Sequence, residues 1–434
     1  MTQQDQPGRE SGGAGRRARR VATSRADRRP RVAGKRKAAQ PGRTVTKVIL
    51  ATLLSLGMLT GLGVVLVYNN WNSNLKFQDI GAQVKNRPDK KVSGPKEPLN
   101  ILVMGSDTRA CGGCKIDGEA GGGLSDTTIL FHLSADRKFA YGISIPRDTA
   151  VMRPTCYKPN GTAIPAATSY SKWNAAFAVG GPACTIQQFE QLTKVLVDKY
   201  VVIDFGQFKD MVNALGGVEV CIPEDIDDEV RHIHLKKGTR EIKGDEALTY
   251  VRVRYRVGDG TDTQRTRRQQ AFIGSMINKA LTAGMLTRPD RLVSFMNAAT
   301  SSLQSDFQNF AKIANVAVTA QGIGPDNIKF VTTPWAGTDK VSGGVEWTPE
   351  VEKLWQLVID DRPLTREFAR DAISAGDKPD GSPSGTATAT GGATGSGSPS
   401  PSPSETTSPS QGATKPGKQG GLSEEGRAAA GLCT

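Results

Sequence analysis

The sequence predicts a layered α/β domain, with helices on both faces of a central mixed sheet, preceded by one transmembrane helix. Three observations lead to this prediction. Residues 48–68 form an uncharged apolar segment about as long as a bilayer core is thick. Beyond residue 98, short apolar runs bounded by turn residues alternate with amphipathic segments. Strands interleaved with helices are typical of α/β layers.

The positive charge of the chain is concentrated at its N-terminus. The formal net charge is +13, and residues 1–47 contain 14 Lys and Arg against three acids, which accounts for +11. We expect this arm to be disordered and cytoplasmic, because basic residues beside a span mark the cytoplasmic side. A basic protein also raises the hypothesis of nucleic-acid binding. The adjacent span explains the charge more simply, so we expect no nucleic-acid partner and an extracytoplasmic location for the rest.

The apolar segment is predicted to stay in the mature chain as a single-pass membrane span. A cleaved signal peptide, the alternative, starts nearer the N-terminus, has a shorter apolar stretch and ends in small residues. This segment instead continues into Tyr68 and Trp71, aromatic residues that suit a membrane interface. A polar connector is expected over residues 69–98.

The predicted elements of the folded domain follow in a regular order. Strands are expected at residues 99–104, 127–133, 139–145, 201–205, 218–222 and 328–332. Helices are expected at residues 172–179, 186–199, 265–283 and 309–321, and between residue 205 and the Gly216-Gly217 stop. The folded domain is predicted to span residues 99–370. The Ser/Pro/Thr/Gly-rich residues 371–434 are predicted to be a disordered tail.

The six cysteines are consistent with an oxidising compartment. Cys111 and Cys114 form a C-x-x-C in a glycine-rich loop, but no second pair of ligands at the right spacing completes a zinc site. We therefore expect a bridge between these two, and Cys156 is a candidate partner for Cys184. Cys221 is either a buried thiol or a member of a third bridge, and the sequence leaves the connectivity open.

The motifs of common hydrolases and nucleotide-binding proteins are absent. The sequence has no G-x-S-x-G elbow, no P-loop, and no G-x-G-x-x-G between a strand and a helix. Its three histidines are His132, His232 and His234. The last two flank Ile233 in a charged segment, where an exposed hairpin is favoured over a metal site.

Charged residues gather at the ends of three predicted strands. Asp107 and Arg109 follow the first strand, Asp126 precedes the second, and Arg147 and Asp148 follow the third. In open α/β sheets, ligands bind beyond the strand ends. Carboxylates and guanidinium groups there suit a divalent ion held against phosphate oxygens, because such an ion keeps one or two carboxylates and arginine binds phosphate in a bidentate manner.

A second group of cations lies between residues 250 and 269. Arg252 and Arg254 alternate with valines, so they share one face of an extended segment. Arg265, Arg268 and Gln269 fall on one stripe at the start of a predicted helix. A helix N-terminus favours anions, so cations crowded there indicate a phosphate ligand among them.

Six segments, in order, resemble those of the LytR–CpsA–Psr family. They are NILVMGSDTR, LSDTTIL, SIPRDTAV, KWNAAFAVGGP, VVIDFGQFKDMVNALGGVEVCIPEDIDD and ALTYVRVRYRVGDGTDTQRTRRQQ. Their order and spacing match from about residue 99 to residue 284. The resemblance implies an extracytoplasmic phosphotransferase. Such an enzyme moves an anionic glycopolymer, for example a teichoic acid, from a polyprenyl-pyrophosphate carrier to peptidoglycan.

The resemblance also implies roles for single residues. Asp107 and Asp126 match carboxylates that hold Mg²⁺ against the pyrophosphate, and Arg147 belongs with them among the catalytic residues. The residues expected to bind substrate are Arg109, Lys172, Arg252, Arg254, Arg265, Arg268 and Gln269. Asp148 is expected to orient Arg147, while Asp204 either touches substrate or supports a residue that does. Asp126 or Asp107 is the expected proton acceptor, since no histidine is available.

Other hypotheses stay open beside the transferase. A pyrophosphatase would use the same residues with water as acceptor. A sensor of the lipid carrier or of wall polymer would bind without turnover. A transcription attenuator would need a DNA-binding fold, which the arm before Lys47 lacks the apolar periodicity to build. The glycine-rich insert of residues 111–123 is expected to change acceptor access, and the Arg, Ala and Gly content suggests an actinobacterial source.

Overall fold

The computed structural model describes residues 41–92, 97–106, 123–229, 232–253, 262–281, 288–381, 422–430 and 432–434. The chain forms two compact units, Met1–Leu62 and Gly63–Thr434. Helix α1 (Pro41–Asn74) contains the segment Thr44–Asn74, which is long and apolar enough to cross a membrane. This helix includes the predicted span and is compatible with single-pass anchoring.

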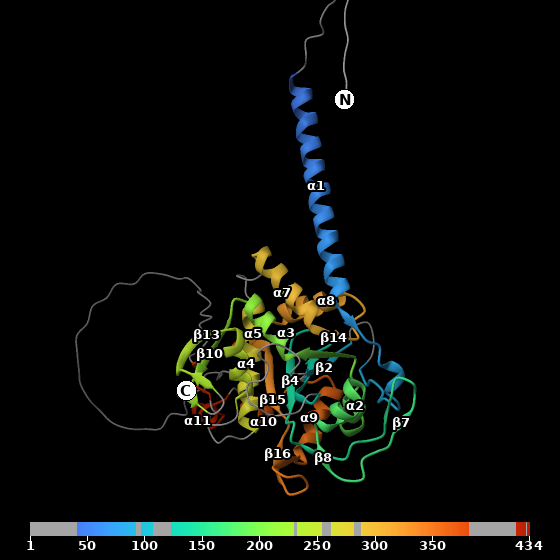
Figure 1. The fold of residues 1–434 in the computed structure, drawn as a ribbon, viewed down its shortest axis with the longest axis vertical. Helices are drawn as coiled ribbons and strands as arrows, with labels where there is room; N and C mark the ends of the chain where they lie inside the picture. Colours follow the sequence, from blue (N-terminus) through green and yellow to red (C-terminus); the bar gives the residue numbers. More distant parts are fainter. Residues whose placement is uncertain are drawn as a thin grey trace, which may run out of the picture. The chain divides into compact units, whose positions relative to one another are not determined.

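The second unit is built on an eight-stranded mixed sheet in the order β1-β14-β9-β2-β3-β4-β15-β18 (Figure 1). Its strands are β1 (Lys76–Phe77), β2 (Leu99–Ser106), β3 (Ser125–Leu133), β4 (Ala140–Ile145), β9 (Lys199–Asp204), β14 (Leu303–Ser305), β15 (Ile328–Thr332) and β18 (Ile373–Ser374). Strand β3 runs antiparallel to both β2 and β4, whereas β2 pairs with β9 and β4 with β15 in parallel. The predicted central mixed sheet is therefore confirmed.

Helices cover both faces of this sheet. They are α2 (Ala175–Thr193) and α9 (Glu350–Ile359) on one face, and α5 (Asp262–Leu281) and α8 (Phe310–Ile323) on the other. Successive residues of a strand point to opposite faces. Leu102 accordingly packs in the cluster that contains Phe189 of α2, while Ile101 packs in the cluster that contains Phe330. Burying a side chain of this size contributes about 1.5–3 kcal/mol.

The most central strands are apolar on both sides. All six residues of β4 are buried, as expected for a strand sandwiched between two helix layers. Gly142 allows the closest approach there, because a Cβ atom at this position would lie 2.8 Å from the Phe330 ring. A larger side chain would push β15 away from β4.

A second, smaller core lies beside the main sheet. It contains α3 (Phe205–Ala214), α4 (Gly244–Arg252), β10 (Val218–Ile222), β11 (Ile226–Asp228), β12 (Ile233–Leu235) and β13 (Gly238–Ile242). The predicted strand at residues 218–222 exists, but it pairs with β13 in a separate two-stranded sheet. On the β11–β12 hairpin, His234 Nδ1 lies 2.5 Å from Asp227 Oδ1, and both side chains are more than half exposed. The predicted exposed hairpin is confirmed.

The remaining elements are short or lie at the periphery. They are β5 (Ala150–Val151), β6 (Cys156–Tyr157), β7 (Ala163–Ile164), β8 (Ser171–Lys172), α7 (Pro289–Ser302), β16 (Trp335–Thr338), β17 (Gly344–Trp347), α10 (Arg366–Arg370) and α11 (Glu424–Ala429). Trp71, expected at a membrane interface, packs its ring 4.6 Å from that of Phe310, and its Nε1 donates to Asn297 Oδ1 over 2.7 Å.

Two local predictions differ from the structure. The helices expected at residues 172–179 and 186–199 form the single element α2, which is bent where Gly181 adopts a positive φ of 63° and ends at Thr193. Residues 250–252 are helical, not extended. Ala247, Leu248 and Val251 of α4 are buried on one helical stripe, a period that the short Arg/Val alternation concealed.

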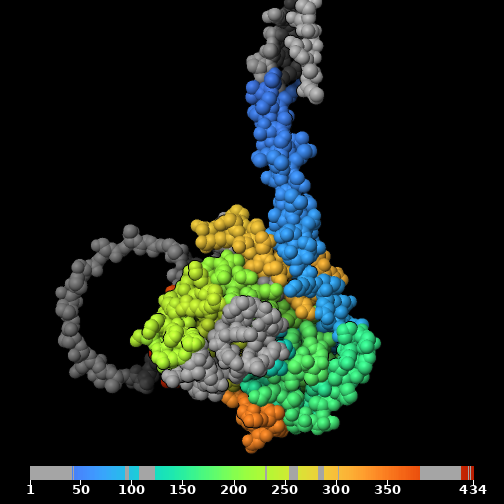
Figure 2. Space-filling model, in the orientation of Figure 1, coloured from blue at the N-terminus to red at the C-terminus, as the bar shows by residue number. Residues whose placement is uncertain are grey.

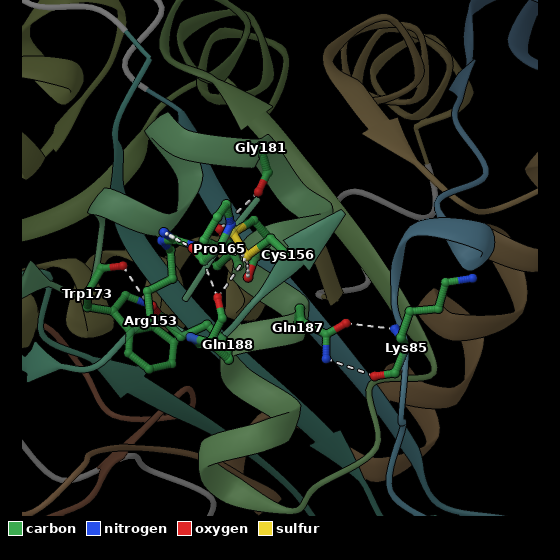
Figure 3. The surroundings of a disulfide bond; sticks show 11 residues. Lys85, Arg153, Cys156, Pro165, Trp173, Gly181, Gln187 and Gln188 are labelled. Atoms are coloured by element: carbon green, nitrogen blue, oxygen red, sulfur yellow. Dashed lines mark hydrogen bonds between the residues drawn. A yellow bond between two sulfur atoms is a disulfide. The ribbon is translucent and has the colours of Figure 1, made fainter. Parts of the chain in front are cut away.

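Two disulfides join segments of the second unit within the described residues. The candidate pair Cys156 and Cys184 does form a bridge, with Cα atoms 5.1 Å apart (Figure 3). Nearby, Gln188 Nε2 donates to the Trp173 carbonyl over 3.1 Å. Cys221 is a member of another bridge, to Cys433. The expected bridge between Cys111 and Cys114 lies outside the described residues.

The C-terminal segment departs from the predicted disordered tail. Ile373 pairs with Phe330 of the main sheet, the Leu422 amide donates to the Ala372 carbonyl, and Leu432 is buried in the core. The prediction of disorder from residue 371 is therefore wrong for the described residues of this segment. Its few apolar residues are held by strand pairing with the main sheet and by the bridge from Cys433. Amino-acid composition gives no sign of either contact.

Candidate active site

The ends of five strands lie along one edge of the main sheet. Ser106 at the end of β2 pairs with Asp204 of β9 and with Ser125 at the start of β3. On the other side, Ser144 of β4 pairs with Thr332 at the end of β15. The residues that follow β2, β4, β9 and β15 therefore emerge together, at the kind of edge where α/β sheets bind ligands.

Asp126 is the extra residue of a β-bulge at this edge. Gly105 pairs with Thr127 and Ser106 pairs with Ser125, so that Asp126 has no residue opposite it. A bulge bends its strand and re-aims the side chain that it carries. The Asp126 side chain is only 13% exposed, and its Oδ1 accepts a hydrogen bond from Arg147 Nη1 over 2.6 Å.

Arg147 lies among three carboxylates. Besides its contact with Asp126, its Nε lies 3.4 Å from Asp262 Oδ1 and 3.8 Å from Asp148 Oδ2. Burial lowers the pKa of Arg147, but the negative charges of Asp126 and Asp262 outweigh that effect and raise it. Asp148 also accepts a contact from Lys172 Nζ at 2.8 Å. Positively and negatively charged side chains therefore lie in contact at the end of β4, in a partly buried site.

Helix α5 brings a buried ion pair to the same place. Asp262 is its first residue, where a negative charge is favoured by the helix dipole, and its carboxylate contacts the guanidinium of Arg265. Burial raises the pKa of Asp262 and lowers the pKa of Arg265. Asp262 is not among the residues predicted from the sequence, although an acid at the start of an arginine-rich helix is a visible signal.

Several buried polar atoms of this cluster have no hydrogen-bond partner among the described residues. They are the Nε atoms of Arg147 and Arg265 and both carboxylate oxygens of Asp262. Buried polar groups are nearly always hydrogen-bonded, and leaving one without a partner costs about 1–3 kcal/mol. Unused guanidinium donors at a strand-end edge are suited to phosphate oxygens.

The other predicted residues of α5 bind the protein itself. Arg268 is almost fully buried, and its Nη2 donates to the Val253 carbonyl. Gln269 Nε2 donates to the Val251 carbonyl over 3.0 Å, while its Oε1 accepts from Thr127 Oγ1 over 3.1 Å. These contacts join the end of α4 and the start of β3 to α5. They fix the position of the strand that carries Asp126.

Arg252 and Asp204 lie at neighbouring element ends. Arg252 is the last residue of α4, and its guanidinium stacks 4.8 Å from the Phe205 ring. Asp204 caps α3, because its carboxylate accepts from the Gly206 amide over 2.8 Å.

Residues 66–358 match the LytR_cpsA_psr family.

The chain belongs to the LytR_cpsA_psr family.

Two relatives and one solved structure illustrate the similarity to this family. The chain is 30% identical over 315 residues to the polyisoprenyl-teichoic acid–peptidoglycan teichoic acid transferase TagV of Bacillus subtilis, covering 68% of this chain and 76% of that protein. It is 28% identical over 310 residues to the cell wall biosynthesis protein LcpA of Corynebacterium glutamicum, covering 65% of this chain and 59% of that protein. The crystal structure of B. subtilis TagV gives a TM-score of 0.47 at 28% identity, covering 62% of this chain and all of that one.

The described part of this LytR_cpsA_psr protein supplies oxygen ligands of the kind a hard cation prefers. Among the described residues, no three His, Cys, Asp or Glu side chains come together in a way that could hold a metal ion. Mg²⁺ does not require three, because it usually keeps one or two carboxylates and takes further oxygens from phosphate and water. Asp126 fits that role. Its predicted metal partner Asp107, with the predicted phosphate ligands Arg109 and Arg254, lies outside the described residues.

Proposed function

We propose that this chain is a membrane-anchored phosphotransferase that moves an anionic glycopolymer from a polyprenyl-pyrophosphate carrier to peptidoglycan. Membership of the LytR_cpsA_psr family and similarity to proteins named as teichoic acid transferases support this class of reaction. The observation that carries the proposal is the pair of buried guanidinium Nε atoms of Arg147 and Arg265, neither of which makes a hydrogen bond among the described residues, beside Asp126.

The donor pyrophosphate would bind through the arginines. In the free protein, Asp126, Asp148 and Asp262 offset the charges of Arg147 and Arg265, which limits the cost of burying them. The pyrophosphate oxygens would accept from the unused Nε donors. Lys172, held by Asp148, would contribute a further positive charge at the rim.

The reaction would be an in-line displacement at the phosphorus that carries the glycan. A hydroxyl oxygen of the acceptor forms a new bond to that phosphorus, and the bond from the phosphorus to the bridging oxygen breaks. The bridging oxygen keeps the electron pair and leaves as polyprenyl phosphate, while the hydroxyl proton passes to Asp126 or Asp107. The arginines lower the barrier because they stabilise the charge that develops on the leaving phosphate.

The proposal includes Mg²⁺ because the described residues do not supply the positive charge that a bound pyrophosphate requires. The charges of Arg147, Arg265 and Lys172 are matched by the carboxylates of Asp126, Asp148 and Asp262, so a pyrophosphate would arrive at a cluster of these six residues with no surplus positive charge. Asp126 and Asp107 would hold the ion. When bound, it would act as a Lewis acid on the phosphate oxygens.

The proposal includes the topology of the chain. The basic arm of residues 1–47 would lie in the cytoplasm and the domain that follows α1 outside the membrane. The two disulfides of the described residues suit an oxidising exterior. The lipid carrier and the peptidoglycan acceptor would then be reached from the same side.

The test uses the full-length protein in lipid vesicles, with a synthetic polyprenyl-pyrophosphate glycan, Mg²⁺ and peptidoglycan. Glycan bound to the acceptor and released polyprenyl phosphate are both followed. Transfer that is lost in Arg147→Ala supports the proposal. Equal release of lipid phosphate without acceptor would instead indicate a pyrophosphatase, and tight binding without release would indicate a sensor.

A further inference from the structure

A separate cleft opens beside the candidate active site, at the carboxyl end of β15. It has a volume of about 290 Å³, near the lower end of the roughly 300–1,000 Å³ typical of ligand sites. The residues that matter for its chemistry are Arg267, Thr333, Trp335, Glu350, Glu367 and Arg370. They come from α5, from the segment after β15, and from α9 and α10.

Backbone contacts join this cleft to the loop that carries Arg147. The Thr333 amide donates to the Ser144 carbonyl over 3.0 Å. Ser144 precedes Arg147 by three residues, a separation of at most about 11 Å even in a fully extended chain. The Val345 amide of β17 donates to the Asp148 carbonyl over 3.1 Å. The β16–β17 hairpin, which projects from the domain in Figures 1 and 2, is therefore attached directly to the Arg147 loop.

Helix α5 contributes to both places. Arg265 lies in the ion cluster with Asp262. Further along the same helix, Gln270 Nε2 donates to Ser144 Oγ over 2.9 Å and to Thr332 Oγ1 over 3.0 Å. Arg267 lines the cleft. Only helix α5 and the end of strand β15 would thus separate a molecule in the cleft from Arg147 and Arg265.

The lining of the cleft suits a sugar. Trp335, on the hairpin, is 42% exposed and offers a rigid apolar surface with a polar edge. Around it lie carboxylates from Glu350 and Glu367 and guanidinium groups from Arg267 and Arg370, which together accept and donate hydrogen bonds as sugar hydroxyls and acetamides require. With Asp371, the lining holds three carboxylates against two guanidinium groups, so the cleft has no excess of positive charge to attract a polyanion.

Thr333 adds an independent sign of a ligand. The residue is fully buried in the wall of the cleft, and its hydroxyl has no hydrogen-bond partner among the described residues. Leaving a buried hydroxyl without a partner is unfavourable. A hydroxyl-bearing molecule bound against this wall would remove that cost.

We propose that this cleft binds the acceptor, with one sugar ring of a peptidoglycan glycan strand packed on Trp335. The inference rests on the proposed transferase function and adds where its second substrate lies. Bound there, the sugar presents a hydroxyl toward the Arg147 loop, while the lipid pyrophosphate occupies the arginine cluster. Donor and acceptor sites are then separate, so each can be weakened without the other.

The experiment measures binding of a soluble peptidoglycan glycan fragment, a disaccharide-peptide, to the full-length protein in detergent by calorimetry. Trp335→Ala is expected to weaken this binding at least tenfold, Trp335→Phe to weaken it less, and Thr333→Val to weaken it severalfold. The control is Phe77→Ala, at an aromatic residue of similar exposure on β1, at the far end of the sheet order, and this variant should bind the fragment as the wild type does. Melting temperatures identify any variant that fails to fold.

The outcomes separate this inference from the proposed function. Unchanged fragment binding in a folded Trp335→Ala protein overturns the acceptor site, even if transfer is observed. Loss of lipid-donor affinity in that variant, with fragment affinity kept, also overturns it and assigns the cleft to the donor glycan. Fragment binding that depends on Trp335, in a protein that transfers nothing from the lipid donor, supports the cleft and refutes the transferase.

Discussion

Arg147 Nη1 donates to Asp126 Oδ1 over 2.6 Å and so joins the loop after β4 to the bulge at the start of β3. Each residue holds the other in place: the carboxylate keeps the guanidinium at the strand ends, and the guanidinium keeps the bulged side chain from turning to solvent. Both side chains remain about seven-eighths buried. The pair therefore sets the geometry of the candidate active site before any substrate arrives.

Arg147→Ala should reduce kcat/KM for glycan transfer by a factor of about 10²–10³, the usual loss when one donor to a developing negative charge is removed. Arg147→Lys should recover little, because an ammonium group lacks the planar fork that arginine offers to both Asp126 and phosphate. The measurement is initial transfer rate at several donor concentrations. Activity above a tenth of the wild-type value in the alanine variant would contradict this role.

Asp126→Asn should raise the Mg²⁺ concentration needed for half-maximal transfer at least tenfold, because the amide keeps the shape of the side chain but removes the charge that binds a cation. A chelator should abolish transfer by the wild-type protein, and added Mg²⁺ should restore it. Asp245→Asn, at an exposed residue paired with Lys209, is the control. An unchanged Mg²⁺ dependence in Asp126→Asn would remove this residue from the metal site.

Asp262→Asn should change how stability depends on pH. Because burial raises the pKa of Asp262, the folded state favours the protonated acid. The stabilisation is then complete below about pH 4, the ordinary pKa of aspartate, and is lost as pH rises through the raised value. The free energy of unfolding of Asp262→Asn relative to wild type should therefore increase from pH 4 upward. Denaturant titrations across this range would show a constant difference if the pKa of Asp262 were not raised.

Asp204 allows a test between two roles. As the N-cap of α3 it should tolerate Asp204→Asn, since asparagine caps a helix as well as aspartate does, whereas Asp204→Ala should lower the free energy of unfolding by about 1 kcal/mol. Neither variant should lose much transfer activity at a temperature where both are folded. If Asp204→Asn were stable but inactive, the carboxylate would have to touch substrate or metal.

Cys433→Ser should lower the free energy of unfolding by about 2–4 kcal/mol, because the bridge to Cys221 closes a long loop. The described residues that follow position 421 should then become sensitive to limited proteolysis. Cys221→Ser should give the same loss, and the double variant should add nothing. Full stability in either single variant would mean that the packing of Leu432 and the hydrogen bonds of this segment hold it without the bridge.

Much of the main sheet is visible in the sequence. The apolar runs predict β2, β3 and β4 within about two residues at each end, since these strands are buried on both faces and bounded by polar turns. The prediction that charged residues meet at one edge follows from the same strand directions. The bulge at Asp126 is not predictable, because it depends on the register between two strands.

Other features depend on contacts between distant parts of the chain. The burial of Asp262 arises from the way α5 packs over the sheet edge, so the sequence shows its charge but not its raised pKa. The helical ending of α4 at Arg252 is set by its buried stripe against the smaller core. The local Arg/Val alternation is compatible with a strand as well as with a helix.

The positions of the two bridges in the sequence also set the order in which they can form during synthesis. Cys156 and Cys184 are 28 residues apart and can join soon after both are made, but 212 residues separate Cys221 from its partner. Because a chain is synthesised from its N-terminus, Cys221 is still without its partner Cys433 while α4, α5 and α9 are being made. The correct bridge can form only after Cys433 has been made, so its formation follows the synthesis of every strand of the main sheet.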